Sequence, residues 1–291
     1  MTGVPAGPSL AERNKMKTKT EAVIVSQKQI QDGICDLVLS VPVIAEQAVP
    51  GQFVNVFLND PSKLLPRPIS LCGTDAEEGT IRLAYRVSGE GTGTEELSRM
   101  REGERVSVMG PLGNGFPLEE AAGRHVCLIG GGIGIPPMLE TARVLHSSVG
   151  VSGRKGDGEY LTAPTEITSV LGFRDRTFLV PEFEAYGKVL IATEDGSTGT
   201  KGNVLDAIRG DGTEPGVIFA CGPLPMLRAL KAFAAAHHIP CWISMEERMA
   251  CGIGACLACV CRTTETDPHS HVKNARVCAD GPVFEAGKLD L

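Results

Sequence analysis

Residues 249–259 read MACGIGACLAC, and this short stretch holds three of the chain's ten cysteines, Cys251, Cys256 and Cys259. Eighteen residues separate them from a fourth, Cys278, so the pattern is C-x4-C-x2-C followed by a distant cysteine. This spacing is typical of plant-type [2Fe–2S] sites, which take thiolates from one tight loop and one separate segment. The glycines at 252 and 254 suit such a loop, because glycine turns sharply and lets N–H groups approach sulfur.

The same four thiolates are also able to hold zinc. Structural zinc usually takes two C-x2-C pairs, whereas here only Cys256 and Cys259 form one. The spacing therefore favours a cluster over zinc, with disulfides third. A further cysteine, Cys261, alternates with Cys259, so we expect a packed thiol there rather than a ligand. An iron–sulfur cluster carries single electrons, and the rest of the chain should indicate their source and destination.

Length and composition narrow the function classes. A chain of 291 residues is long enough for two compact domains and an appendage. The net charge of −7 and the aromatic content of 4% give no support to nucleic-acid or anionic-membrane binding. Residues 1–20 are polar and lack the apolar core of a signal peptide or an anchor, so we expect a disordered tail. Cysteines scattered singly along the chain indicate reduced thiols and a cytoplasmic location.

The first third of the chain consists of short apolar-alternating runs separated by turns. Such runs occur at residues 22–25, 35–39, 53–57 and 81–85, which predicts an antiparallel barrel or sandwich. Within it, LPRPISL (residues 65–71) fixes Arg67 and Ser70 between prolines, which suits a pyrophosphate and a ring nitrogen. A glycine-rich turn at residues 88–97 then leads into a helix whose free N–H groups suit a phosphate. Either segment alone is more often an ordinary loop.

The middle third alternates apolar strands with glycine turns and helices. An apolar run at residues 125–129 enters GGGIGIPP (residues 130–137) and then an apolar helix. Further strands at 170–174, 189–193 and 217–220 predict an open parallel sheet with ligands at the carboxyl ends of its strands. Residues 147–168 lack periodicity and are expected to be a surface insertion. Arg174 and Arg176 flank Asp175 beyond the second strand, which leaves NAD and NADP both open.

The order of these segments resembles the ferredoxin reductase-like flavoproteins. The resemblance implies that Arg67 binds an FAD phosphate and that Ser70 binds the flavin edge. It extends the predicted FAD site to Pro68, Ile69, Ala84, Tyr85, Arg86, Gly91 and Thr92. The same family has a Gly-Gly-x-Gly-x-x-Pro turn and a Cys-Gly-Pro turn in its pyridine-nucleotide domain. The implied NAD site consists of Gly131, Gly132, Gly134, Cys221, Gly222 and Pro223, with Cys221 facing the nicotinamide; a buried thiol is the alternative.

The C-terminal stretch is the most specific. MEERMACGIGAC (residues 245–256) and CADGPVF (residues 278–284) closely resemble the electron-transfer subunits of class 1B dihydroorotate dehydrogenases. The resemblance covers residues 21–291 and implies an oxidoreductase subunit with one FAD and one [2Fe–2S] cluster. The implied cluster ligands are Cys251, Cys256, Cys259 and Cys278.

The family also implies a separate FMN-bearing catalytic subunit in a heterotetramer with two copies of each chain. Electrons from dihydroorotate would pass from FMN through the cluster to FAD and leave as hydride to NAD+, in pyrimidine (UMP) biosynthesis. The chain shows no candidate catalytic base of its own. We expect a tail (1–20), an FAD-binding β-barrel (21–118), an α/β NAD domain (122–240) and a [2Fe–2S] domain (241–291). The partner is expected to dock near residues 251–261.

Two rival functions remain at this point. One is the FAD/[2Fe–2S] reductase subunit of another redox complex, of the sulfhydrogenase, transhydrogenase or oxygenase type. The partner that co-purifies with the chain would distinguish it. The other is a zinc-binding scaffold without redox activity, which a colourless, flavin-free protein would indicate.

Overall fold

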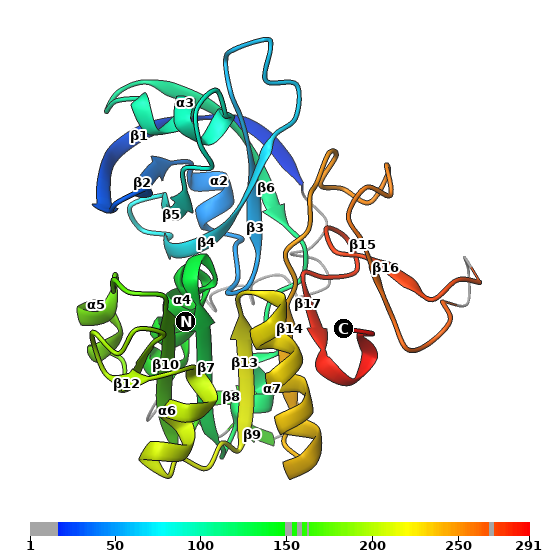
Figure 1. The fold of residues 1–291 in the computed structure, drawn as a ribbon. Helices are drawn as coiled ribbons and strands as arrows, with labels where there is room; N and C mark the ends of the chain where they lie inside the picture. The colour runs from blue at the N-terminus through cyan, green and yellow to red at the C-terminus, as the bar shows by residue number, and fades with distance from the viewer. Residues whose placement is uncertain (1–16, 149–152, 156–158, 162, 268–270) are drawn as a thin grey trace, which may run out of the picture.

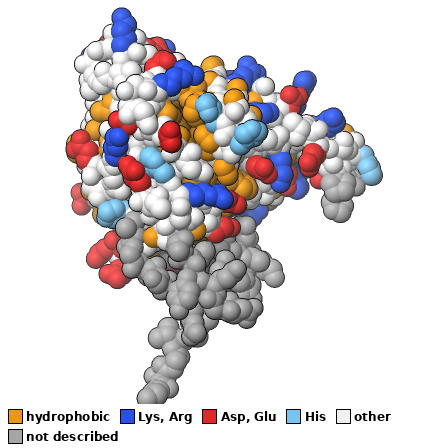
Figure 2. Space-filling model, turned by 90° about the horizontal axis from the view of Figure 1, so that it is seen from below, with side chains coloured by type: hydrophobic (Ala, Val, Ile, Leu, Met, Phe, Trp, Pro, Cys, Tyr) orange, Lys and Arg blue, Asp and Glu red, His pale blue; other side chains and the backbone are white. Residues whose placement is uncertain are grey.

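The structure is a computed structural model that describes residues 17–148, 153–155, 159–161, 163–267 and 271–291. A barrel is stacked on an α/β domain, and the C-terminal segment lies beside both (Figure 1). On the face shown in Figure 2, acidic and basic side chains are interspersed, with hydrophobic side chains between them. No helix in the described part of the chain is long and apolar enough to cross a membrane.

The N-terminal part is a closed barrel of antiparallel strands in the order β1-β2-β5-β4-β3-β6, which confirms the predicted barrel. Alternation along β3 explains its two faces: Val54 and Val56 fill the barrel core, whereas Phe53 packs with residues of the other domains. The elements are β1 (Thr18–Gln31), β2 (Ile34–Ser40), α2 (Pro42–Ala45), β3 (Phe53–Phe57), β4 (Arg67–Asp75), β5 (Thr80–Arg86), α3 (Gly93–Arg99) and β6 (Arg105–Leu112).

The barrel begins earlier than the sequence predicted. Thr18, Lys19 and Thr20 lie in β1 and pair with residues 108–110 of β6, so they are not part of a tail. The polar alternation of this segment hid the strand, because it lies at the end of β1, where one face is exposed. The rest of the predicted tail, residues 1–16, lies outside the described residues.

The α/β domain contains a seven-stranded sheet in the order β12-β11-β10-β7-β13-β14-β17. All neighbours are parallel except β14 and β17, which confirms the predicted parallel-sheet domain. Residues of α4 and α5 pack on one face and residues of α6 and α7 on the other. The elements are η1 (Leu118–Ala121), β7 (His125–Gly131), η2 (Gly132–Gly134), α4 (Ile135–Ser148), β8 (Gly153–Lys155), β9 (Glu159–Leu161), β10 (Glu166–Phe173), α5 (Val180–Glu184), β11 (Lys188–Thr193), β12 (Thr200–Lys201), α6 (Val204–Asp211), β13 (Val217–Cys221), α7 (Leu224–His237) and β14 (Cys241–Ser244).

Two predicted boundaries change. The insertion expected at residues 147–168 is shorter, because α4 continues to Ser148, β10 begins at Glu166, and β8 and β9 pair between them. Part of it, at 149–152, 156–158 and 162, lies outside the described residues. The C-terminal domain does not begin at Cys241, because β14 pairs in parallel with β13 and so belongs to the α/β sheet.

The C-terminal segment is not a free-standing unit. It comprises β15 (Val260–Arg262), β16 (Asn274–Arg276), β17 (Val283–Glu285) and η4 (Ala286–Lys288). β15 and β16 form a small two-stranded sheet, whereas β17 pairs antiparallel with β14 and covers the edge of the large sheet. The segment is therefore joined to the α/β domain by backbone hydrogen bonds.

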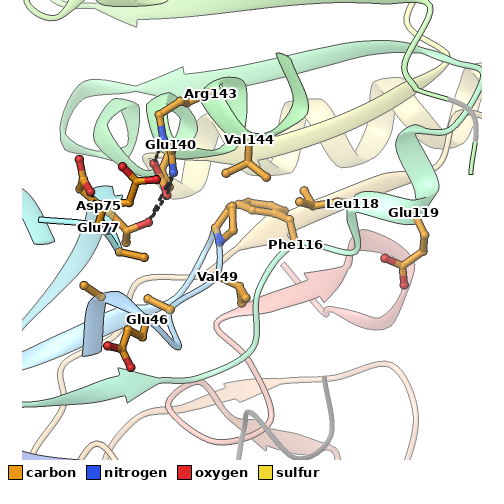
Figure 3. A pocket seen from close by; sticks show the side chains of 15 residues that line it. Glu46, Val49, Asp75, Glu77, Phe116, Leu118, Glu119, Glu140, Arg143 and Val144 are labelled. Carbon is orange, nitrogen blue, oxygen red and sulfur yellow. Dashed lines mark hydrogen bonds and ion pairs between the residues drawn. The ribbon is translucent and has the colours of Figure 1, made fainter. Parts of the chain in front are cut away.

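A buried polar contact joins the barrel to α4. The Glu140 side chain on α4 is 1% exposed and accepts hydrogen bonds from Thr74 Oγ1 of the barrel (2.6 Å) and from Arg143 (2.7 and 2.8 Å). These residues line a cavity of about 600 Å³ at the junction of the two domains (Figure 3), with Phe116 at its middle. None of the site residues predicted from the sequence lies in this cavity.

Glu140→Ala should lower the free energy of unfolding by about 2 kcal/mol, because it leaves Thr74 and the partly exposed Arg143 without their buried acceptor. Chemical denaturation followed by circular dichroism measures the change. The matched control is Glu120→Ala, which removes a more exposed ion pair with Arg124 and should cost less than about 1 kcal/mol. Equal losses in the two variants would contradict the role given to Glu140.

Candidate functional site

A cavity of about 690 Å³ lies where the barrel, the α/β domain and the C-terminal segment meet. Its walls come from β3, the segment leading into β4, the end of β5, and the stretch before the first cysteine of the 249–259 segment. The lining residues are Phe53, Leu65, Pro66, Arg67, Pro68, Ile69, Ser70, Ala84, Tyr85, Arg86, Ser88, Thr94, Ile133, Met245, Glu246, Glu247, Arg248, Met249 and Pro282.

Arg67 lies against the start of α3. A Cβ atom on Gly93 would stand 2.6 Å from Arg67 Nε, so only glycine leaves room for the guanidinium here. Thr92 is the N-cap of α3, and its Oγ1 accepts from the backbone N–H of Glu95 (3.3 Å). The Glu95 carboxylate in turn accepts from Gly91 N (2.7 Å), one residue before the N-cap. A guanidinium beside a helix start is a favourable arrangement for a phosphate group.

Seven of the nine predicted FAD residues line the cavity, Tyr85 among them. The Tyr85 hydroxyl turns into the barrel and donates to Gln27 Oε1 (3.3 Å). Burial raises the pKa of this phenol, and the neighbouring Cys35 raises it further. Because its hydroxyl donates to Gln27, Tyr85 lines the cavity with its other atoms. Gly91 and Thr92 do not line the cavity and lie beside it, at the start of α3.

The predicted NAD glycines lie at the carboxyl ends of β7 and β13, where the two turns interlock. A Cβ on Gly134 would stand 2.4 Å from the carbonyl carbon of Cys221, and one on Gly131 would stand 2.7 Å from Met226 Sδ. Gly222 has a φ of 157° and approaches Gly131 N. Adjacent parallel strands whose turns carry glycine leave backbone N–H groups open to a dinucleotide at this end of the sheet.

Cys221 and Glu246 face each other at the junction of the two sites. Cys221 Sγ lies 4.0 Å from Glu246 Oε1. Burial raises the pKa of the Cys221 thiol well above its usual value, and the Glu246 charge raises it further. Burial also raises the pKa of Glu246, against the opposing effect of Arg86. Cys221 is thus a protonated thiol at neutral pH and a poor nucleophile.

The sequence analysis assigned no role to Glu246 or to the neighbouring cavity residues Met245, Glu247, Arg248 and Met249. The sequence does contain a signal for these residues. The charged segment EER (residues 246–248) lies between a buried strand and the cysteine loop, where exposed charges are best explained by a site that they line. Met245 and Met249 are buried, and the charged residues between them face the cavity.

By burial, the four cysteines of the predicted cluster fall into an outer pair, Cys251 and Cys256, and a buried inner pair, Cys259 and Cys278. Within the inner pair, Cys278 N donates to Cys259 Sγ (3.4 Å). Gly254 N donates to Cys278 Sγ (3.1 Å), which holds the loop of the first pair against the second. Within the described ranges, no three His, Cys, Asp or Glu side chains converge closely enough to hold one metal ion.

The cysteine spacing predicts a two-iron cluster. A [2Fe–2S] cluster takes four thiolates across two irons, whereas tetrahedral zinc needs all four thiolates around one centre. Glycine is required in the loop, because Gly252 has a φ of 71° and Gly254 a φ of 84°. The ligand set itself stays a prediction.

The two pairs differ in surroundings. Cys259 and Cys278 are buried, whereas Cys256 is exposed. Burial opposes ionisation of Cys251, but backbone N–H groups of Ile253, Cys256 and Ala255, together with the Cys256 side chain, lower its pKa to about 6. Burial, followed by hydrogen bonding to Cys259, raises the pKa of Cys278 to about 12. Because metal ligation requires thiolates, loading this inner pair must release protons.

Cys261 lies in β15 and is 7% exposed. Burial raises the pKa of its thiol to about 11. These surroundings agree with the expectation of a packed thiol rather than a ligand.

Two family models match the chain. The model of the oxidoreductase FAD-binding domain matches residues 21–116, and that of the iron–sulfur cluster binding domain of dihydroorotate dehydrogenase B matches residues 246–290. The predicted FAD-binding and iron–sulfur binding domains are thereby confirmed. The zinc-scaffold alternative gains no support from either match.

Individual relatives match nearly the whole chain. The electron transfer subunit of dihydroorotate dehydrogenase B (NAD(+)) from Geobacillus sp. (strain WCH70) is 44% identical over 280 residues, which cover 95% of this chain and 100% of that one. The same subunit from Bacillus caldolyticus is 43% identical over 274 residues, covering 92% and 97%. A solved structure of an NADH-dependent reduced ferredoxin-NADP oxidoreductase has a TM-score of 0.77 at 31% identity and covers 92% of this chain and 89% of that one.

Proposed function

We propose that this chain carries electrons from an FMN-containing catalytic subunit by way of its [2Fe–2S] and FAD sites to NAD+. The premise is that the chain belongs to the family of electron-transfer subunits of dihydroorotate dehydrogenase B (NAD(+)). The observation that carries the proposal is the shared wall between the flavin cavity and the cluster loop. Met249 lines the cavity, and Cys251 follows two residues later. The proposed setting is pyrimidine biosynthesis in the cytoplasm.

When bound, the cluster supplies one-electron transfer and FAD couples single electrons to a hydride. The chain's own residues hold and shield these groups. Arg67 and the start of α3 bind the phosphate part of FAD, and Ser70 binds the edge of its ring. The interlocking turns of β7 and β13 admit the nicotinamide, and Cys221 remains protonated and small beside it. The buried side chains of Met245 and Met249 exclude water between the two sites.

The outer cysteine pair reaches the surface among exposed apolar side chains. Ile253, Leu257 and Val260 are 45%, 61% and 38% exposed, and Leu257 has the unusual φ of 57°. Neighbouring apolar side chains that stay exposed, one of them on a strained backbone, indicate a contact surface for another protein. We assign this surface, within the expected 251–261 segment, to the catalytic subunit of a heterotetramer with two copies of each chain.

Co-expression with an FMN-containing dihydroorotate dehydrogenase subunit tests the proposal. The complex should reduce NAD+ with dihydroorotate, and Leu257→Asp should release the partner in size-exclusion chromatography while the chain keeps its FAD and iron. Exposed Val25, on β1 of the barrel, provides the control variant Val25→Asp, which should leave the complex intact. A complex that forms yet transfers no electrons from dihydroorotate to NAD+ would contradict the proposal.

A second candidate is the reductase subunit of another redox complex. It is supported by the likeness to the ferredoxin-NADP oxidoreductase structure, which extends over nearly the whole chain. Reduction of NAD+ by reduced ferredoxin in place of dihydroorotate would favour this function.

A further inference from the structure

Asn55 is a buried polar residue on the outer face of the barrel, next to the cluster loop. It lies in the middle of β3 and is 0% exposed. Its neighbours Val54 and Val56 point into the barrel core, so the Asn55 side chain points away from that core. Asn55 Nδ2 donates to the backbone oxygen of Cys251 at 3.4 Å, across 196 positions of sequence.

The contact is close on both sides. A Cβ atom on Gly252 would stand 2.2 Å from Asn55 Nδ2, so the loop reaches this position only with glycine at 252. Asn55 Oδ1 is buried and has no hydrogen-bond partner among the described residues. The opposite amide orientation would place two oxygens against each other at Cys251. The chain thus keeps a buried amide with one unpaired acceptor, which costs free energy. The hydrogen bond that the same amide donates to Cys251 is a reason to retain it.

The cluster loop (residues 246–256) has little support from backbone hydrogen bonds. In the described chain, no backbone–backbone hydrogen bond involves residues 246–256. Arg276 Nη1 donates to the Gly254 oxygen (3.3 Å) and Gly254 N donates to Cys278 Sγ (3.1 Å), but both partners belong to the C-terminal segment itself. Asn55 is therefore the polar side chain that joins this loop to the FAD barrel.

A second asparagine makes the equivalent link for the other ligand-bearing segment. The turn after Cys278 is held by Asn114, which follows β6: its backbone N donates to Gly281 O and its Nδ2 to Asp280 O, both at 2.7 Å. The barrel thus contacts both ligand-bearing segments through asparagine.

We propose that Asn55 is a positioning residue that ties the cluster loop to the FAD barrel and so fixes the first thiolate relative to the flavin cavity. The inference rests on the proposed function, because it assumes that Cys251 ligates the cluster. Without the amide, the loop should open more often, increase the exposure of Cys251 and leave the cluster less firmly held.

The full-length chain is tested as Asn55→Ala. The rate of iron release to a ferrous chelator should rise at least about 5-fold, and hydrogen–deuterium exchange at residues 250–257 should increase. The electron paramagnetic resonance signal of the reduced cluster should broaden, because the cluster then occupies more than one position. Asn55→Asp keeps the shape and replaces the donor by an oxygen, so it should act in the same direction and serves if Asn55→Ala fails to fold.

Two controls separate positioning from general stability. Val54→Ala removes a core methyl pair from the neighbouring position, and should lower stability without accelerating iron release. Asn59→Ala removes an exposed asparagine whose Nδ2 donates to Arg105 O (3.1 Å) and not to the cluster loop, and should change neither quantity.

The rescue experiment uses Gly252→Ala, whose added methyl meets Asn55 Nδ2. The double variant with Asn55→Ala should release iron more slowly than Gly252→Ala alone, because the clash is gone. Unchanged iron release and exchange in a folded Asn55 variant would overturn the role of Asn55 and leave the proposed function intact. A wild-type chain without two irons would overturn both.

Discussion

Cys256→Ser should reduce electron transfer from the catalytic subunit to NAD+ by about 100-fold or more, since even residues that only support a metal ligand cost 10- to 100-fold. Reduction of a dye by NADH should persist, because that reaction needs FAD and nicotinamide but not the cysteine loop. Cys256 is exposed and lies outside the buried core, so the loss of its thiol should not unfold the chain. Stopped-flow absorbance with dihydroorotate and then with NADH measures the two reactions.

The control for this variant is Cys261→Ser. Cys261 is two positions from Cys259 but packs in β15, so its replacement should leave transfer from the partner largely unchanged. Full transfer in Cys256→Ser, or an equal loss in Cys261→Ser, would show that the ligand set is wrong.

Arg67→Gln should weaken FAD binding by about 10- to 100-fold, which corresponds to the loss of one charge-assisted hydrogen bond to a phosphate. The variant keeps a polar side chain of similar length beside Gly93, so the loss reflects charge and fork geometry rather than packing. FAD released on gel filtration and the fluorescence of free flavin measure the effect. Cluster absorbance should remain, because the hydrogen bonds of Arg67 go to Leu65 O and Pro66 O and not to the cysteine loop.

Arg99→Gln is the matched control, since Arg99 is an exposed arginine at the other end of α3 whose ion pair among the described residues is with Glu95. It should retain FAD. Undiminished FAD binding in Arg67→Gln would remove Arg67 from the predicted site.

Local patterns predicted most of the fold. The strands at residues 53–57 and 125–129 followed from alternation in one case and a continuous apolar run in the other, because each pattern reports how many faces are buried. β17 was missed because Val283–Glu285 is too short to show a period, and its role depends on β14, some forty residues earlier.

The residues of the candidate site also fall into those that a local pattern predicts and those that depend on a distant contact. Cysteine spacing predicted the cluster loop, and the proline and glycine segments predicted Arg67 and the nucleotide turns, because these features are local. Glu246 and Asn55 were missed, since each acts through a contact with a distant segment. Nothing in the strand FVNVF indicates that Asn55 meets a loop nearly two hundred residues later.

The pairing of β17 with β14 has a consequence for biosynthesis. The ribosome completes the barrel and the first six strands of the large sheet before β17 emerges, so the edge of β14 stays open until residues 283–285 are made. An open edge invites pairing with other chains. A nascent chain that stops before residue 283 therefore exposes the unpaired edge of β14. Once β17 has paired, the edge strand on this side is only three residues long, and very short edge strands limit pairing with other chains. The segment that holds the cysteines thus also supplies the edge strand that protects the sheet.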